Sequence, residues 1–543
     1  MNKAKIVCLV NKAEIYFFYI FLVINLLPVL VFKFFPTVDG PAHLYNSRLI
    51  LELARQSGPL NDYFIFNEIS PNWLGHIILS LSLLIFPANI AEKCLLLIYF
   101  IGFPISFRAY IRIRPDHNST LTYFVFPFTY SFLLFYGFYN FHLGLVFFFW
   151  TLYLWVKYNH EFTIKRTFFL LILTTLMCLS HLFVFAVFIL IVSISNIREL
   201  PDLVNPYKER RKRFLKVLIH QILALSIGLI IMIKFILTNA EESTLPTYIN
   251  PSALLKWLMQ IQPAKGIVYG KEDIFTRWIF ITLVLLISYL LYYKIKRFLA
   301  AKSKINFLLN FGLRRNFGLI MSIVFLVALF IVPDSHGAAV GLVSSRIILF
   351  FFLFLIAWLS TKKFHTWLHI LAFVIINYVN IALLDIYYSA TKDNNFLAAE
   401  ISKASREIEP FKTVLPALNS DYWLHGHISN YLGIDRPMVI LENYEATLDW
   451  FPLKWNSNKI PNLYFGKMSP EEGCLSWVRN INNDIAMIDY VFILNDEQEI
   501  ISEDCAKKIS NALNEDYLEV YKSENNKILV YRLNSNASYT LDR

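Results

Sequence analysis

Long apolar stretches separated by short polar segments fill the first 385 residues of the chain. Runs of about 20 apolar residues are typical of transmembrane helices, whereas a β-barrel shows short alternating segments. The pattern predicts eleven spans, at about 15–35, 89–111, 119–136, 141–157, 166–180, 182–197, 215–237, 274–293, 317–333, 347–361 and 364–385. The stretch 72–87 is shorter and follows a proline, so we expect an interfacial or re-entrant segment. His181 favours a break within 166–197, with one long helix as the alternative.

The composition agrees with a helical membrane protein. Hydrophobic residues make up 56% of the 543 positions and aromatic residues 17%. Charged residues reach only 17%, against about 25% in soluble domains. These values exclude a soluble enzyme, a disordered chain and a disulfide scaffold.

The charges divide the chain into two predicted domains. The formal net charge is +10, but residues 1–385 carry +18 and residues 386–543 carry −8. We therefore predict an all-α transmembrane domain over 1–385, with an outer juxtamembrane loop at 36–87, and a polar domain over 386–543. The positive excess lies mainly in loops between spans, which argues against a nucleic-acid partner.

The basic residues also predict the orientation. With the N-terminus inside, the inner segments hold 25 Lys and Arg residues and the outer loops hold seven. Positively charged loops stay in the cytoplasm, so we expect the N-terminus inside and the C-terminal domain outside. The predicted location is the cytoplasmic (inner) membrane of a bacterium, crossed many times.

The C-terminal domain is predicted to be α/β or α+β. Four short runs have the pattern of strands, namely Lys412–Leu418, Pro437–Leu441, Ile488–Leu494 and Lys527–Leu533. Cys474 and Cys505 lie in this domain. Outside the cytoplasm they are equally consistent with a disulfide bond and with two free thiols.

The loop after the first span carries the first candidate site. Pro41 suits the first turn of a new amphipathic helix, and Asp39 stands just before it. Asp39 is either the helix cap or a carboxylate at the membrane boundary that takes a proton from a nucleophile. His43 follows four residues later, and Arg48 is a candidate phosphate partner.

Further polar residues stand at the outer ends of the predicted spans. They are Asn140, His142, His181 and His336. Polar groups at such positions often line a cavity, although each is also consistent with ordinary packing. Arg346 opens a late span and is either a snorkelling anchor or a guanidinium that binds a lipid phosphate.

Motifs that the sequence lacks narrow the range of possible substrates and reactions. The sequence has no phosphate-binding glycine loop, no Asp-x-Asp pair and no Cys-x-x-Cys pair, so we expect no nucleotide and no ATP-driven pump. His425 and His427 would share one face if they lay on a strand, but a third metal ligand is not evident, and a binding loop is the preferred interpretation. No metal site is assigned, and a divalent metal stays open as a cofactor.

Taken together, these features resemble GT-C-type polytopic membrane glycosyltransferases. The resemblance rests on Asp39 in the first outer loop, on the number of spans, on Arg346 at a late span and on the outer C-terminal domain. The chain departs from the paired acidic motif of that class, because Gly40 and His43 follow Asp39.

The resemblance implies a polyprenyl-phosphate-linked sugar as donor and a lipid or glycan as acceptor. It also implies that membrane lipids surround the protein. It implies Asp39 as general base, with His43, His142 and His336 around the pocket and Arg346 at the phosphate. A transporter or flippase for a lipid-linked substrate is the alternative, and an inert scaffold for envelope assembly is a third.

Overall fold

The computed structural model describes residues 3–114, 117–158, 161–197, 208–238, 245–267, 270–300, 316–336, 341–456, 488–495, 510–511 and 513–534. The chain forms two compact units, which are described separately. Unit 1 comprises 1–28, 97–134 and 141–390, and unit 2 comprises 29–96, 135–140 and 391–543.

Helices make up most of the described chain. In order, the α-helices are α1 (Lys3–Asn25), α2 (Leu27–Val31), α3 (Gly40–Ala54), α4 (Leu60–Tyr63), α5 (Leu74–Leu83), α6 (Ala88–Arg112), α7 (Phe132–Phe135), α8 (Tyr139–Tyr158), α9 (Ile164–Ser180), α10 (Leu182–Ile197), α12 (Lys208–Thr238), α13 (Pro251–Met259), α14 (Asp273–Ala300), α16 (Phe317–Ile331), α17 (Val343–Leu359) and α18 (Thr366–Ala404). The 3-10 helices are η1 (Ser119–Phe128), η2 (Gln262–Ala264), η3 (Ser405–Glu407), η4 (Trp423–His425), η5 (Ile428–Gly433) and η6 (Tyr444–Thr447).

The apolar helices follow the predicted spans. In the described part of the chain, α6, α8, α12, α14 and α18 are long and apolar enough to cross a membrane, and shorter apolar helices occupy most of the other predicted positions. The predicted span 166–180 coincides with α9. The break at His181 is confirmed, because α9 ends at Ser180 and α10 begins at Leu182. The total of eleven spans stays a prediction.

Two segments differ in form from a regular transmembrane helix. The predicted span 119–136 is divided into η1 and the short α7, with Pro127 inside η1. A proline has no N–H to donate and disfavours a continuous α-helix. The segment 72–87 contains α5, whose ten residues reach about 15 Å, half of a bilayer core.

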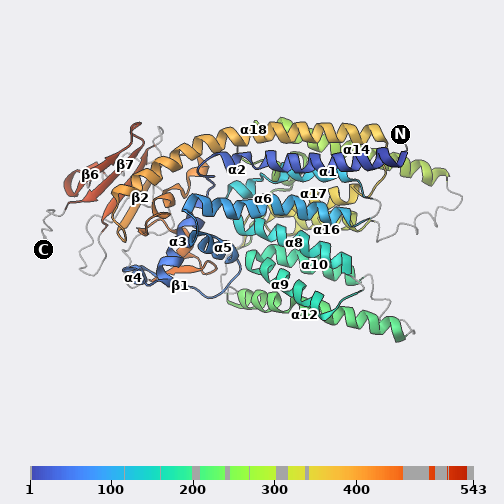
Figure 1. Cartoon of the computed structure of the whole chain (residues 1–543), viewed down its shortest axis with the longest axis horizontal. Helices are drawn as coiled ribbons and strands as arrows, with labels where there is room; N and C mark the ends of the chain where they lie inside the picture. Colours follow the sequence, from blue (N-terminus) through green and yellow to red (C-terminus); the bar gives the residue numbers. More distant parts are fainter. Residues whose placement is uncertain are drawn as a thin grey trace. The chain divides into compact units, whose positions relative to one another are not determined.

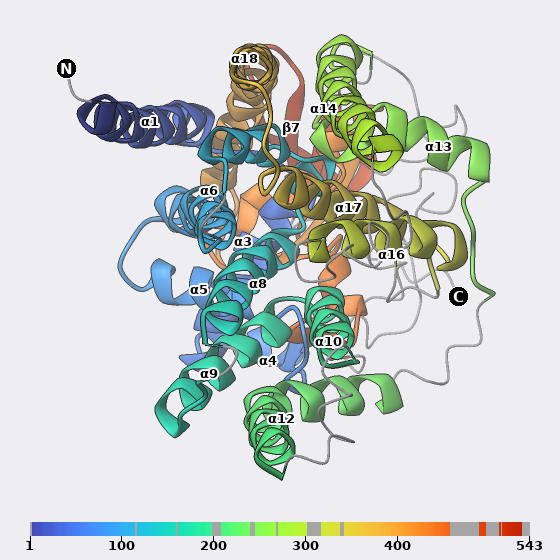
Figure 2. The ribbon, with the colours of Figure 1, turned by 90° about the vertical axis from the view of Figure 1, so that its right-hand side faces the viewer.

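Unit 1 is built from closely packed helices. Figure 1 shows α8, α10, α16 and α17 with their axes nearly parallel in that view, and Figure 2 shows α16 beside α17. Gly318 on α16 allows this approach, because a Cβ there would lie 2.9 Å from the carbonyl oxygen of Phe354 on α17. Aromatic rings fill the interior, for example Phe325 against Phe350 and Phe354.

Unit 2 contains a five-stranded sheet in the order β3-β2-β5-β7-β6. Its strands are β2 (Thr413–Asn419), β3 (Val439–Ile440), β5 (Tyr490–Asn495), β6 (Tyr517–Lys522) and β7 (Ile528–Leu533). β2 pairs in parallel with β3 and β5, and β7 pairs antiparallel with β5 and β6. Four of these strands match the four predicted runs, which confirms them, and β6 was not predicted.

The first loop and the C-terminal part of the chain fold together in unit 2. A second, two-stranded sheet pairs β1 (Phe64–Phe66) antiparallel with β4 (Leu453–Trp455). The buried Tyr45 hydroxyl donates to the Met438 carbonyl (2.8 Å) and accepts from the Ile440 N–H (3.0 Å). The 36–87 loop is therefore joined to the strand region by backbone pairing and by buried hydrogen bonds.

Candidate active site

Asp39 lies in the turn immediately before α3. Its N–H donates to the Tyr136 carbonyl (3.2 Å), and the N–H of Val38 donates to the Phe135 carbonyl (2.9 Å). Gly137 lies against this turn with a φ of +97°, and a Cβ there would be 2.5 Å from the Asp39 nitrogen. Only glycine tolerates both that conformation and that contact, so the backbone at Asp39 is tightly held.

The Asp39 side chain is not used as a helix cap. Asp39 occupies the N-cap position and Pro41 the first turn of α3, as predicted, but the structure of this described segment has no side-chain capping bond. The residue is 6% exposed. Burial raises the pKa of its carboxyl to about 6, although His427 and His43 oppose the shift. The carboxylate is thus held ready for a partner other than the helix.

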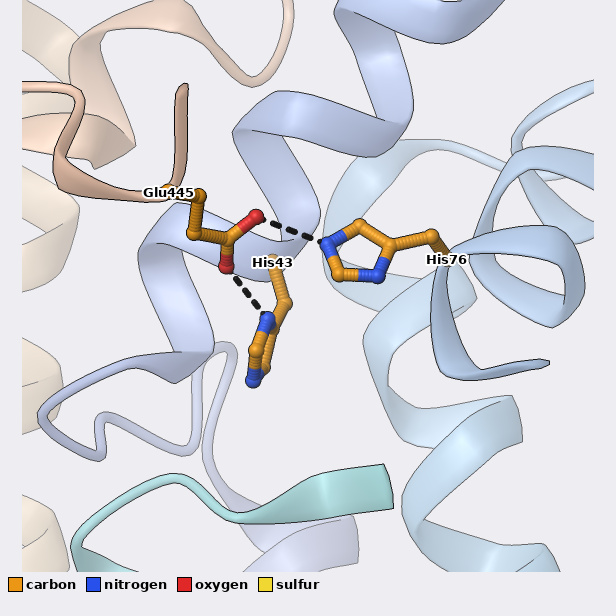
Figure 3. A group of neighbouring side chains, drawn as sticks. All are labelled: His43, His76 and Glu445. Atoms are coloured by element: carbon orange, nitrogen blue, oxygen red, sulfur yellow. Dashed lines mark hydrogen bonds and ion pairs between the residues drawn. The ribbon is translucent and has the colours of Figure 1, made fainter. Parts of the chain in front are cut away.

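His43 belongs to a cluster with His76 and Glu445 (Figure 3). His43 lies on α3 and His76 on α5, and the two rings are 5.0 Å apart. Glu445, on η6, reaches His43 Nδ1 at 2.5 Å and His76 Nε2 at 2.8 Å. Burial raises the pKa of Glu445, but the two histidines outweigh it and hold that pKa at about 2.

A second carboxylate–histidine pair contacts Asp39. His427 lies 3.7 Å from Asp39 through Nε2, and its Nδ1 pairs with the fully buried Glu442. Glu442 also accepts from Ser429 (2.8 Å) and Asn430 (2.6 Å). Burial lowers the pKa of His427, yet Glu442 and Asp39 raise it above its ordinary value. A carboxylate that orients an imidazole toward a second acid favours proton handling at Asp39.

Asn140 supports the cluster from the start of α8. Its side-chain oxygen accepts from the Gly75 N–H (2.7 Å), and its amide donates to the Asn72 carbonyl (2.8 Å). His76 Nδ1 lies 3.3 Å from that same carbonyl. Asn140 therefore fixes the turn that orients His76, which is a positioning role.

Arg48 makes contacts within unit 2. Its Nε donates to the Ile434 carbonyl (3.0 Å), and its guanidinium lies 3.7 Å from Glu52. These contacts connect α3 to the end of η5. A role for Arg48 in binding phosphate stays a prediction.

The remaining predicted residues lie in unit 1. His142 Nε2 is 2.9 Å from the Ser131 hydroxyl, and His181 packs edge-on against Phe141. The Arg346 guanidinium lies 5.7 Å from the Phe141 ring centre. His336 is exposed. The structure thus brings Asp39, His43 and Asn140 together in unit 2, and gathers Arg346 and His181 around Phe141 in unit 1.

The His425–His427 pair differs from the strand arrangement considered for a metal. His425 ends the 3-10 helix η4 and His427 lies in the turn just before η5, and the two residues have different partners. His425 contacts Ser420 (2.7 Å) and Asn394 (3.1 Å), whereas His427 contacts Glu442 and Asp39. The strand alternative is therefore wrong, because an irregular backbone does not place alternate side chains on one face. Cys474 and Cys505 lie outside the described residues.

Sequence reasoning missed His76, Glu442 and Glu445. His76 and Glu445 are 369 residues apart, so no local spacing connects them. His76 stood in the 72–87 segment that was interpreted only as interfacial or re-entrant. The signal that was present is a histidine in an otherwise apolar short helix.

Comparisons with known proteins include similarity to a solved structure. No family model matches the chain, and no curated protein matches it. The crystal structure of ArnT from Cupriavidus metallidurans in the apo state is similar, with a TM-score of 0.45 and 11% sequence identity. The alignment covers 96% of this chain and 98% of that one.

Proposed function

We propose that this protein is a membrane glycosyltransferase that moves a sugar from a polyprenyl-phosphate donor to a lipid-linked or envelope acceptor. The observation that carries the proposal is Asp39, a buried carboxylate beside the end of the first apolar segment that does not cap its helix. The lack of nucleotide-binding motifs supports a donor that is carried by a lipid. The distribution of basic residues supports an outward placement of the site.

Asp39 acts as the general base in this scheme. The acceptor hydroxyl loses its proton to the Asp39 carboxylate while its oxygen attacks the anomeric carbon. The bond from that carbon to the phosphate oxygen breaks, the electron pair leaves with the lipid phosphate, and the configuration inverts. A pKa of about 6 suits this task, because a base near the working pH is mainly ionised and still accepts a proton.

The pair of His427 and Glu442 orients and stabilises the base. Protonated His427 stabilises the Asp39 carboxylate before the reaction. Glu442 keeps the imidazole turned, since it accepts at Nδ1 and leaves Nε2 toward Asp39. The arrangement comes from the C-terminal part of the chain, which gives that part a role in the site itself.

Arg346 is the proposed partner of the departing phosphate. It is 7% exposed and lies in the first turn of α17. Phe141 and Phe183 flank its guanidinium at 5.7 and 5.9 Å. A guanidinium binds phosphate through two parallel hydrogen bonds and stabilises developing charge. His142, His181 and His336 stay proposed substrate-binding residues.

The test is sugar transfer by the purified full chain in nanodiscs, with a panel of radiolabelled polyprenyl-phosphate sugars. Asp39→Asn should lower the turnover rate by about 10²–10⁴-fold and leave the melting temperature near that of the wild type. The matched control is Asp421→Asn, an exposed aspartate of the same unit, which should keep full activity. Normal turnover in the Asp39 variant would remove it as the base. Movement of an intact lipid-linked sugar across the membrane of liposomes that contain the protein, without sugar transfer, would instead favour the transporter.

A further inference from the structure

Three buried side chains of unit 2 meet at one point with donor atoms that metals use. His43 comes from α3, His76 from α5 and Glu445 from η6, and one ligand atom of each lies within 4.8 Å of the others. They are 5%, 0% and 1% exposed. Figure 3 shows both imidazole rings turned toward the carboxylate.

A hydrogen bond at the far side of each ring places one N–H proton. His43 Nε2 lies 3.0 Å from the Gly137 carbonyl, and His76 Nδ1 lies 3.3 Å from the Asn72 carbonyl. A carbonyl oxygen only accepts, so those two ring nitrogens carry the N–H. In the neutral rings, His43 Nδ1 and His76 Nε2 then present lone pairs to Glu445. Metal-binding histidines are oriented in this way by carbonyl groups behind them.

The two contacts with Glu445 differ. His76 Nε2 is within hydrogen-bond distance of Glu445 Oε2, at 2.8 Å. His43 Nδ1 and Glu445 Oε1 are 2.5 Å apart, yet neither atom has a hydrogen bond of acceptable geometry to any described residue. A metal ion needs no N–H alignment and satisfies both atoms at once.

We infer that His43, His76 and Glu445 form a site for a divalent first-row transition metal, with Zn²⁺ as the best fit. Two imidazoles and one carboxylate are a common zinc ligand set. Mg²⁺ and Ca²⁺ prefer oxygen ligands, which this site supplies from one residue only. Three protein ligands leave one tetrahedral position for water or substrate.

The ion would connect the two halves of unit 2. Two of its ligands come from the first loop and the third from the C-terminal part, so binding stabilises their association. His43 lies one helical turn from Asp39, and the ion would add positive charge beside that carboxylate. The inference goes beyond sugar transfer, and metal binding is measured whether or not transfer occurs.

The test measures metal content and thermal stability of the purified full chain. After dialysis against a chelator and then against Zn²⁺, wild-type protein should hold about one zinc per chain by mass spectrometry, and its melting temperature should rise with free Zn²⁺. His76→Asn and Glu445→Gln should each weaken zinc affinity by more than about 100-fold, beyond the cost of losing an outer hydrogen bond. His425→Asn, a buried histidine of the same unit with other partners, should keep the zinc.

The proposal is overturned if wild-type protein takes up no zinc and melts at the same temperature with and without chelator. In that case two imidazolium groups balance the charge of Glu445. Zinc retained equally in both ligand variants also overturns it. If the ligand variants fail to fold, the visible spectrum of Co²⁺-loaded wild-type protein decides whether the metal binds at this site. Bands typical of tetrahedral nitrogen and oxygen ligation support the site, and an octahedral spectrum contradicts it.

Discussion

Units 1 and 2 handle buried polar groups in different ways. In unit 1, buried hydroxyls such as those of Thr174 and Tyr387 donate to backbone carbonyls, namely those of Ala224 and Ala264. In unit 2, charged groups contact other charged groups, from Glu442 through His427 to Asp39. Buried charge is costly unless it is paired. Unit 1 has paired charges too, Arg108 with Glu14 and Lys265 with Asp273, so unit 2 is distinguished by several buried carboxylates and histidines that contact one another.

Breaking the charged cluster should have the largest effect on folding. Glu445→Leu leaves two buried imidazoles without their carboxylate, which should cost about 3–5 kcal/mol of unfolding free energy. The comparison in unit 1 is Glu161→Leu, because the side chains of Glu161 and its partner Arg166 are 79% and 34% exposed. Denaturant unfolding in detergent should show the smaller loss for the Glu161 variant. Equal losses would remove the contrast between the units.

The paired amides of Asn46 and Asn443 should give the next largest effect. Each amide donates to the other, at 2.9 and 2.8 Å, and both residues are buried. Asn46→Leu should cost about 1–3 kcal/mol for each amide group left without a partner. The double variant with Asn443→Leu should lose less than the sum, and a double-mutant cycle on melting curves measures that coupling. Additive losses would show that the pair is not coupled.

Close helix packing should dominate in unit 1. Gly318→Ala places a Cβ 2.9 Å from the Phe354 carbonyl, and the overpacking should cost about 1–3 kcal/mol. Gly341→Ala is the control, because a Cβ there meets nothing within 4 Å. Melting temperatures of the two variants should differ clearly, and a Gly318 variant as stable as the control would contradict the close contact.

The smallest effect is expected at the surface of unit 2. Arg55 lies 3.5 Å from Glu52, and its side chain is 52% exposed. Exposed ion pairs contribute less than about 1 kcal/mol, so Arg55→Gln should leave the unfolding transition almost unchanged. A loss of stability as large as that of Glu445→Leu would show that charge alone, and not burial, determines the cost of breaking an ion pair.

Local patterns were sufficient to predict much of the fold. The four strand runs, the break at His181 and the new helix at Pro41 all follow from residue order, because turn chemistry and apolar runs are local. The segment 119–136 was harder, since its composition suits a span but Pro127 favours a 3-10 path. β6 was missed because its exposed residues alternate weakly.

Only part of the candidate site could be predicted from the sequence, for a physical reason. Asp39 and His43 stand out because a carboxylate and a histidine interrupt an apolar boundary. Glu445 and His76 are recognised as site residues only through contacts between distant segments, and the spacing of residues in a single sequence does not reveal such contacts. The capping alternative for Asp39 was likewise decided only by the side-chain direction.

The bond from Tyr45 to Met438 has a consequence for biosynthesis. The two residues are 393 positions apart, and synthesis at 5–20 residues per second separates them by about 20–80 s. During that time the first loop waits without its C-terminal partner while the helices between them are made. A ribosome that stops early therefore releases a chain that lacks His427, Glu442 and Glu445, so completion of the site reports that translation has passed these residues.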